Sequence, residues 1–149
     1  MIYLTDTNVL LRFARHTDAS YPIIQMAVRK LQANGHQLQT TSQNVAEFWN
    51  VSTRSTSRNG FGLTPYETNG LLQDLEETFP LLLDFPDAYS IWRQLVVKYD
   101  VSGVQVHDAR LVATMLVHDV THILTFNTQD FIRYRPEGII AIDPSEEIN

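Results

Sequence analysis

The chain has no cysteine among its 149 residues. Disulfide bonds and thiolate metal sites are therefore excluded. It also lacks an apolar run approaching the ~18 residues of a membrane-spanning helix, and its first residues do not form a basic leader followed by an apolar core. These absences lead us to expect a soluble protein of the cytoplasm.

Basic residues are scarce. The 11 lysines and arginines are outnumbered by 17 aspartates and glutamates, so the net charge is −6. This balance argues against the broad basic surface of a nonspecific nucleic-acid binder. A site built of carboxylates can nevertheless hold metal cations and thereby attract a phosphate backbone. Any contact with nucleic acid must then come from a few local arginines.

Several motifs of other enzyme classes are missing as well. The sequence contains no Walker loop, no GxGxxG and no GxSxG, which removes the usual signatures of nucleotide binding and acyl transfer. The five histidines do not suggest a zinc site, because zinc needs three or four converging ligands. His118 and His122 are four residues apart, but the helix is expected to end between them.

The pattern that is present alternates strands with helices along a chain long enough for one domain. We expect strands at residues 2–4, 36–41, 81–85, 122–126 and 139–142. Helices are expected at residues 8–15, 22–34, 43–54, 64–78, 86–99 and 105–118, with a short one at 128–133. The strand at 81–85 is expected to be buried. Ser42 is expected to cap the helix at 43–54. This alternation predicts an α/β fold with a mostly parallel sheet of four to five strands and helices on both faces.

Asp6 follows the first strand and precedes Thr7 and Asn8. Open α/β sheets bind their ligands at the carboxyl ends of the strands, so this position suits a functional carboxylate. An aspartate before a helix is also a common helix cap. Asp6 alone does not decide between the two interpretations.

Asp108 lies on a helix whose apolar stripe contains Leu111, Val112 and Met115. These residues are three, four and seven positions further on, so Asp108 faces the same side as the core. A buried carboxylate is costly unless an opposite charge compensates it. The positive end of the helix dipole could supply that charge, and a bound cation would supply more.

Glu47 and Asp130 complete the set of candidate carboxylates. Glu47 is in the helix that starts where the second strand ends, although a solvated surface glutamate would look the same. Asp130 follows the fourth strand, where it could also cap a short helix. Carboxylates that converge at one edge repel one another and are tolerated chiefly when hard cations bind between them.

The four segments stand in a recognisable order: Asp6-Thr7-Asn8, Ala46-Glu47-Phe48, His107-Asp108-Ala109 and Asn127-Thr128-Gln129-Asp130-Phe131. In this order and over the whole chain, the sequence resembles the PIN-domain ribonucleases, notably the VapC-type toxins of toxin-antitoxin pairs. The resemblance implies a three-layer αβα sandwich. It also implies that Asp6, Glu47, Asp108 and Asp130 chelate Mg²⁺ or Mn²⁺ and cut single-stranded RNA, which could be tRNA, rRNA or mRNA. Such proteins are usually neutralised by a small antitoxin and often form homodimers.

One position departs from the family pattern. Many members have an acidic residue where this chain has Asn127, so we expect weakened but not abolished metal binding. Thr7, Asn8 and Asn127 are candidates for orienting the ligands through hydrogen bonds. Arg54 and Arg58 lie in a Ser-, Thr- and Gly-rich loop and are candidates for gripping phosphates.

Two other functions remain open from the sequence. A PIN-like fold that has lost catalysis could bind RNA or a protein partner, and the amide at Asn127 favours this reading. A phosphatase that uses Asp6 as its nucleophile is the other, but the second aspartate of an Asp-x-Asp pair is absent because position 8 is asparagine. A metal-dependent ribonuclease is the function that accounts for all four carboxylates.

Overall fold

The central element of the computed structural model is a parallel β-sheet, within a chain whose residues 1–148 the structure describes. The sheet of these residues contains five strands in the order β3-β2-β1-β4-β5. Each neighbouring pair is parallel. The strands are β1 (Ile2–Thr5), β2 (Gln37–Thr41), β3 (Leu81–Leu82), β4 (His122–Leu124) and β5 (Ile140–Ile142).

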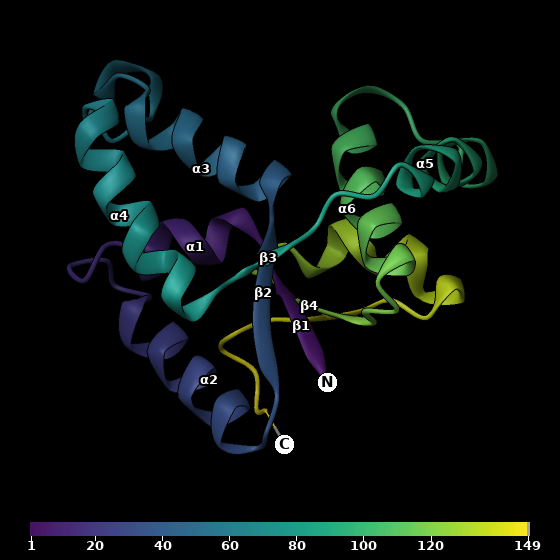
Figure 1. Cartoon of the computed structure of the whole chain (residues 1–149), viewed down its shortest axis with the longest axis horizontal. Helices are drawn as coiled ribbons and strands as arrows, with labels where there is room; N and C mark the ends of the chain where they lie inside the picture. Colours follow the sequence, from purple (N-terminus) through teal and green to yellow (C-terminus); the bar gives the residue numbers. More distant parts are fainter. Residues whose placement is uncertain (149) are drawn as a thin grey trace.

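Helices cover both faces of this sheet, which Figure 1 shows nearly edge-on. One layer consists of α1 (Thr7–Phe13), α2 (Tyr21–Ala33), α3 (Ser42–Thr53) and α4 (Pro65–Thr78). The opposite layer consists of α5 (Asp87–Lys98), α6 (Val106–Val117) and the 3-10 segment η3 (Thr128–Glu137). Two shorter 3-10 turns are η1 (Thr56–Arg58) and η2 (Gly103–Gln105). The predicted three-layer αβα sandwich is therefore confirmed.

Strand residues alternate between two hydrophobic cores, as the period of two in a β-strand requires. Tyr3 of β1 packs into the core beneath α1, α2 and α4, together with Leu124 of β4. The adjacent residues Leu4 and Ile123 belong to the other core, beneath α5 and α6. The sheet is thus buried on both faces, and the buried polar residues Asp6, Thr41 and Thr125 lie at the carboxyl ends of its strands.

The order of the strands reverses beside β1. From β1 the chain adds β2 and then β3 on one side, and it returns to add β4 and β5 on the other side. In open parallel sheets this switch point opens a crevice at the carboxyl ends of the strands, where ligands bind. Asp6 follows β1 and Thr125 follows β4, so both lie at the switch point.

The prediction of a buried strand at residues 81–85 is wrong. β3 contains only Leu81 and Leu82, and the side chain of Leu83 is 67% exposed. β3 pairs only with β2 and forms the edge of the sheet, so no further strand shields its outer side. The apolar run therefore predicted a strand that is longer and more deeply buried than β3.

The predicted cap of α3 is also wrong by one residue. Thr41 is the N-cap, and its hydroxyl accepts a hydrogen bond from the backbone N of Asn44 at 3.1 Å. Ser42 is the first residue of the helix, and its hydroxyl donates to Asp84 Oδ2 at 2.5 Å. Both residues are good caps, and hydrogen-bond geometry rather than residue type selects Thr41.

Among the described residues, none of the helices is both long and apolar enough to cross a membrane.

Candidate active site at the carboxyl edge of the sheet

Asp6 is fixed by four hydrogen bonds at the junction between β1 and α1. Its side chain is the N-cap of α1, with Oδ1 accepting from the backbone N of Thr7 at 2.8 Å. The same oxygen accepts from Asn44 Nδ2 at 3.2 Å. Oδ2 accepts from Thr125 Oγ1 at 2.8 Å and from Asn8 Nδ2 at 3.3 Å. Asp6 therefore caps the helix, and it also receives bonds from α3 and from the end of β4 that a cap alone does not need.

Glu47 is connected to Asp6 through Thr7 and Asn44. Thr7 Oγ1 donates to Glu47 Oε2 at 2.8 Å and accepts from Asn44 Nδ2 at 3.0 Å. Asn44 is held in turn by Thr41, whose hydroxyl donates to Asn44 Oδ1 at 2.6 Å. These bonds fix the orientation of both carboxylates before any ligand binds.

Gln43 connects this network to α6. Its side-chain amide donates to the backbone O of His107 at 2.8 Å, and it lies 3.5 Å from Glu47 Oε1. His107 immediately precedes Asp108. The first turn of α3 and the first turn of α6 are therefore joined across the end of the sheet, next to both carboxylates.

Asp108 and Asp130 line a small hollow on the α6 side. Asp108 is half-buried in the first turn of α6, and Asp130 is exposed in the first turn of η3. The hollow has a volume of about 60 Å³ and is also lined by Gln105, Gln129, Arg133 and Tyr134. The two carboxylates that the sequence placed on separate elements thus meet at one surface.

Electrostatic coupling joins all four carboxylates. Burial, which is the largest cause, and the negative charges of Asp130, Asp6 and Glu47 together raise the pKa of Asp108 to about 7, while the charge of Arg133 opposes the shift. Burial also raises the pKa of Asp6, while its hydrogen bonds from Thr125 and Thr7 lower it. The charges of Glu47 and Asp130 add to the rise at Asp6. The structure therefore brings the four predicted residues into one electrostatic field.

The chemistry of these donors fits a hard divalent cation, which prefers carboxylate and amide oxygens. The four carboxylates are spaced too widely to form a closed metal site. Within residues 1–148, no group of three or more histidine, cysteine, aspartate or glutamate side chains is arranged to hold a metal ion as it stands. The like charges of the four carboxylates explain why the side chains do not pack together without a compensating charge.

Asn8 and Asn127 both make hydrogen bonds near the end of β4, next to Asp6. Asn8 Oδ1 accepts from the backbone N of Phe126 at 3.1 Å, which ties the start of α1 to the end of β4. Asn127 is exposed at the start of η3, and its backbone N donates to Thr125 Oγ1 at 3.0 Å. Asn127 is therefore next to the site, and the role predicted for its side chain stays a prediction.

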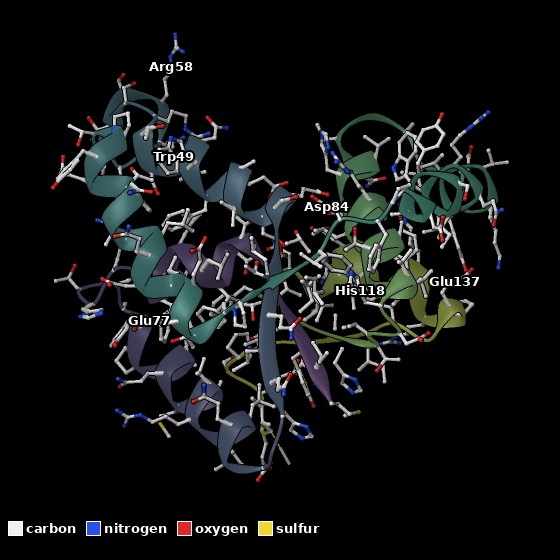
Figure 2. The ribbon with its side chains drawn as sticks, viewed as in Figure 1. Trp49, Arg58, Glu77, Asp84, His118 and Glu137 are labelled. Atoms are coloured by element: carbon white, nitrogen blue, oxygen red, sulfur yellow. The ribbon has the colours of Figure 1, made fainter. Side chains whose placement is uncertain are left out.

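The two arginines predicted to grip phosphates lie at the other end of α3. Arg54 donates from Nη2 to the backbone O of Asn59 at 3.1 Å, so its guanidinium binds its own loop. Arg58 extends away from the rest of the chain beyond α3, as Figure 2 shows. Neither arginine is among the groups whose charge acts on Asp6 or Asp108. Their role in binding RNA stays a prediction.

Four groups that contact or influence the carboxylates were not predicted from the sequence as site residues, and one of them is Gln43, described above beside Glu47. Asn44 and Thr125 bind Asp6 directly, and Arg133 is the basic group acting on Asp108. Thr125 follows β4 as Asp6 follows β1, but the two meet only because β4 lies beside β1 in the sheet. The signal for Asn44 was its position one turn before Glu47 on the same helical line.

The model of the PIN domain family matches residues 3–135 of the chain. The chain belongs to the PIN domain family. No curated protein sequence matches it.

Several solved structures have a similar fold. VapBC2 from Rickettsia felis, bound to a DNA fragment from its promoter, is 14% identical with a TM-score of 0.68, covering 96% of this chain and 98% of that one. VapBC-1 from nontypeable Haemophilus influenzae is 16% identical with a TM-score of 0.69, covering 98% and 100%. Mycobacterium tuberculosis VapC20, described as a sarcin-ricin loop cleaving toxin, is 16% identical with a TM-score of 0.64, covering 94% and 97%. At these identities the likeness shows a shared fold and nothing more.

Proposed function

We propose that this PIN-domain protein is a metal-dependent endoribonuclease that cleaves single-stranded RNA. The observation that carries the proposal is the electrostatic coupling of Asp6, Glu47, Asp108 and Asp130 at the switch point of the sheet. Several carboxylates that repel one another at a ligand-binding edge are typical of a site for hard cations. A PIN domain without such a purpose would gain stability by replacing them.

The four carboxylates would hold Mg²⁺ or Mn²⁺, which when bound supplies an activated water and neutralises negative charge on a phosphodiester. The protein's own contribution is orientation. Thr125, Asn44 and Asn8 hold the carboxylate of Asp6, and the hydroxyl of Thr7 holds that of Glu47. Because the pKa of Asp108 is raised to about 7, its carboxyl group is partly protonated in neutral solution and would have to release that proton in order to hold a cation.

We further propose that the protein acts as the toxin of a toxin-antitoxin pair in the cytoplasm. The support is that the similar folds include VapBC complexes and a VapC toxin. In this proposal the chain forms a homodimer, a cognate antitoxin inhibits it, and its substrate is a tRNA, rRNA or mRNA. Co-expression with the product of a neighbouring short reading frame, followed by co-purification, would test the antitoxin.

A second candidate is a PIN-like module that binds RNA or protein without catalysis. The observation in its favour is that, in residues 1–148, no three metal-binding side chains are arranged to hold an ion as they stand. The amide at Asn127 points the same way, since it adds no charge at an edge where many PIN domains have a carboxylate. Calorimetry with millimolar Mn²⁺ separates the candidates, because only the nuclease needs the ion.

The test of the nuclease uses purified wild-type protein and the variants Asp6→Asn and Asp108→Asn. The wild type is expected to cut a labelled single-stranded RNA with Mg²⁺ or Mn²⁺ and to stop when EDTA is added. Each variant is expected to lose at least about 100-fold in rate, since a ligand should matter no less than the residues that orient it. Undiminished cutting by either variant would falsify the assignment.

Asp119→Asn is the matched control. Asp119 is exposed beyond the end of α6 and has a positive φ of 55°, a conformation that asparagine also adopts readily. This variant makes the same chemical change outside the site, and it is expected to cut RNA at the wild-type rate.

A further inference from the structure

A groove lies between α5, the first turns of α6 and the segment that leads from β3 to α5. Figure 1 shows this segment crossing from the edge of the sheet to the layer of α5 and α6. The groove has a volume of about 450 Å³, which is within the range of pockets that bind small molecules. None of the four carboxylates lines it. It is therefore a surface feature separate from the cation site.

Three aromatic side chains line the groove and remain accessible to solvent. Tyr89 is 63% exposed and Phe85 is 46% exposed. Trp92 is half-buried, and its Nε1 donates to the backbone O of Val106 at 2.9 Å, which fixes the indole ring. The rings of Tyr89 and Trp92 lie 6.2 Å apart. Together they form an aromatic surface that no other part of the described chain covers.

The groove continues the edge of the sheet at which the carboxylates lie. His107 lines the groove and immediately precedes Asp108, and its backbone O accepts from Gln43 beside Glu47. Asp84, which follows β3, also lines the groove and accepts a hydrogen bond from the hydroxyl of Ser42, at the end of β2. An extended chain that is bound at the carboxylates can therefore continue directly into the groove.

The charges around the groove favour an anionic ligand. Arg110 lines the groove and is exposed, and the guanidinium of Arg93 lies 5.9 Å from the ring of Tyr89. Neither forms an ion pair, since the salt bridge found within residues 1–148 joins Lys98 and Glu137. A nucleotide combines an aromatic base with a negative phosphate, so it matches both the aromatic surface and these cations.

We propose that this groove is a base-stacking subsite, in which a nucleobase next to the cleaved phosphate of single-stranded RNA lies on Tyr89 and Trp92 while Arg110 contacts the backbone. That the RNA also reaches the carboxylates rests on the proposed function. Stacking on aromatic side chains binds bases of any sequence and needs no broad basic surface. It therefore supplies affinity for RNA in a protein whose net charge is −6.

A second copy of this chain is the other occupant that an aromatic groove could take. A copy seated there predicts that truncating Tyr89 changes the mass of the protein in solution. A nucleobase predicts an unchanged mass and a change in affinity for RNA. Light scattering on each variant separates the two.

The first experiment uses Trp92 as a reporter. The chain has two tryptophans, and the other, Trp49, lies on α3 in the opposite layer, where Figure 2 labels it. In a Trp49→Phe protein all tryptophan fluorescence comes from the groove. Titration with a single-stranded RNA oligomer in EDTA, where a metal-dependent nuclease does not cut, is expected to quench this fluorescence. A ribose-phosphate oligomer of the same length without bases is expected to leave it unchanged.

The second experiment measures binding of a fluorescein-labelled RNA oligomer by fluorescence anisotropy over a range of salt concentrations. Tyr89→Ala is expected to weaken binding about tenfold, the typical loss of one stacked base. The slope of log K against log salt is expected to stay within about 0.2 of the wild type, because stacking releases no counterion. Tyr89→Phe keeps the ring and is expected to bind as the wild type does.

Arg110→Gln tests the backbone contact in the same assay. It is expected to reduce the salt slope by about 0.7, the loss of one phosphate contact on a single strand. The opposite pattern in Tyr89→Ala and Arg110→Gln would distinguish a base contact from a phosphate contact.

Tyr66→Ala is the matched control for Tyr89→Ala. Tyr66 is 89% exposed in the first turn of α4, which belongs to the opposite layer. Its truncation is expected to leave the affinity and the salt slope unchanged. A thermal melt of every variant confirms that it folds. If Tyr89→Ala fails to fold, the quenching of Trp92 with and without bases carries the test.

Wild-type affinity in Tyr89→Ala would overturn the subsite, as would a changed mass of that variant or equal quenching by the oligomer without bases. A wild-type protein that does not bind RNA would overturn it as well. Failure of the proposed nuclease is recognised separately. A protein that binds RNA through Tyr89 but neither binds Mn²⁺ nor cuts the RNA keeps the subsite and loses the catalytic function.

Discussion

Asp6 and Asp108 lie at the same edge of one sheet, but the protein surrounds them in different ways. Asp6 accepts four hydrogen bonds from the ends of β1 and β4 and from α1 and α3. Asp108 lies at a small hollow beside Asp130 and Arg133, and burial and neighbouring carboxylates raise its pKa to about 7. We call these the Asp6 side and the Asp108 side. The carboxylate of Asp6 is stabilised by hydrogen bonds within the protein, whereas the charge of Asp108 is opposed by burial and by its neighbouring carboxylates.

The difference indicates that the two carboxylates have different roles in the site. The hydrogen bonds on the Asp6 side lower the pKa of its carboxyl group and offset part of the cost of burial. On the Asp108 side, burial and three neighbouring carboxylates raise the pKa, and only Arg133 opposes them. The carboxylate of Asp6 is held in place, and the charge of Asp108 is not compensated. This combination suits a site that forms around a cation.

The largest effect is expected from damage to the Asp6 side. Thr125→Val removes the hydroxyl that donates to Asp6 Oδ2 at 2.8 Å and leaves the carboxylate in place. The free energy of unfolding should fall by about 1–3 kcal/mol, because a buried charged acceptor loses its partner. Affinity for Mn²⁺ should fall about 10–100-fold, as for other residues that orient a ligand. Chemical denaturation and calorimetry measure the two quantities.

Thr114→Val is the control for this variant. Thr114 is 9% exposed, and its hydroxyl donates to the backbone O of Arg110 within α6. The substitution therefore removes a buried hydroxyl that has no part in the site, and Mn²⁺ affinity should not change. Equal losses of Mn²⁺ affinity at both positions would show that the Thr125 hydroxyl has no special role.

Removing the charge on the Asp108 side should have the opposite effect on stability. The folded-state pKa of Asp108 is raised from 3.8 to about 7, so the folded state binds the extra proton. Stability from this group is therefore complete below pH 3.8 and is lost as the pH rises through about 7. Asp108→Asn in EDTA should be more stable than the wild type at pH 8, by about 1 kcal/mol after allowance for solvent screening of a half-exposed group.

The same variant should flatten the dependence of stability on pH between 5 and 8. Denaturation with urea at several pH values, all without metal, measures this. Asp119→Asn, in an exposed position, should keep the wild-type profile. A loss of stability in Asp108→Asn at pH 8 would mean that Asp108 is already compensated, and the contrast between the two sides would fail.

The smallest effect is expected from Asn127→Asp, which adds a carboxylate where many PIN domains have one. Asn127 is exposed next to Thr125, so the new charge would join the site without disturbing the core. Mn²⁺ affinity should rise about threefold to tenfold, since cation affinity follows the number of charged ligands. A calorimetric titration checks it. Unchanged affinity would place residue 127 outside the cation site.

The sequence was sufficient to predict the layers of the fold. It also pointed to four carboxylates that the structure brings into one electrostatic field, and their role as metal ligands stays a prediction. The alternation of strands and helices predicted the parallel sheet, and the residues after the strands and at the starts of helices predicted Asp6, Glu47, Asp108 and Asp130. These inferences work because the carboxyl ends of parallel strands always share one edge. The strand at residues 81–85 was wrong because an apolar run does not reveal that β3 lies at the edge of the sheet.

The partners of the carboxylates could not be predicted in the same way. Thr125 bonds to Asp6 across 119 positions of sequence, and Asn44 across 38. Such contacts depend on which strand lies beside β1, which periodicity does not specify. Arg133 carries no such signal in the sequence, because only the fold places it against Asp108.

The most direct test of the account is a calorimetric titration of Mn²⁺ into the wild type and into Asp108→Asn at pH 7.5. If the Asp6 side and the Asp108 side form one cation site, the wild type binds the ion and the variant binds it at least about tenfold more weakly. If the variant binds Mn²⁺ as tightly as the wild type, or if neither protein binds it, the two sides do not form a cation site and the central claim is contradicted.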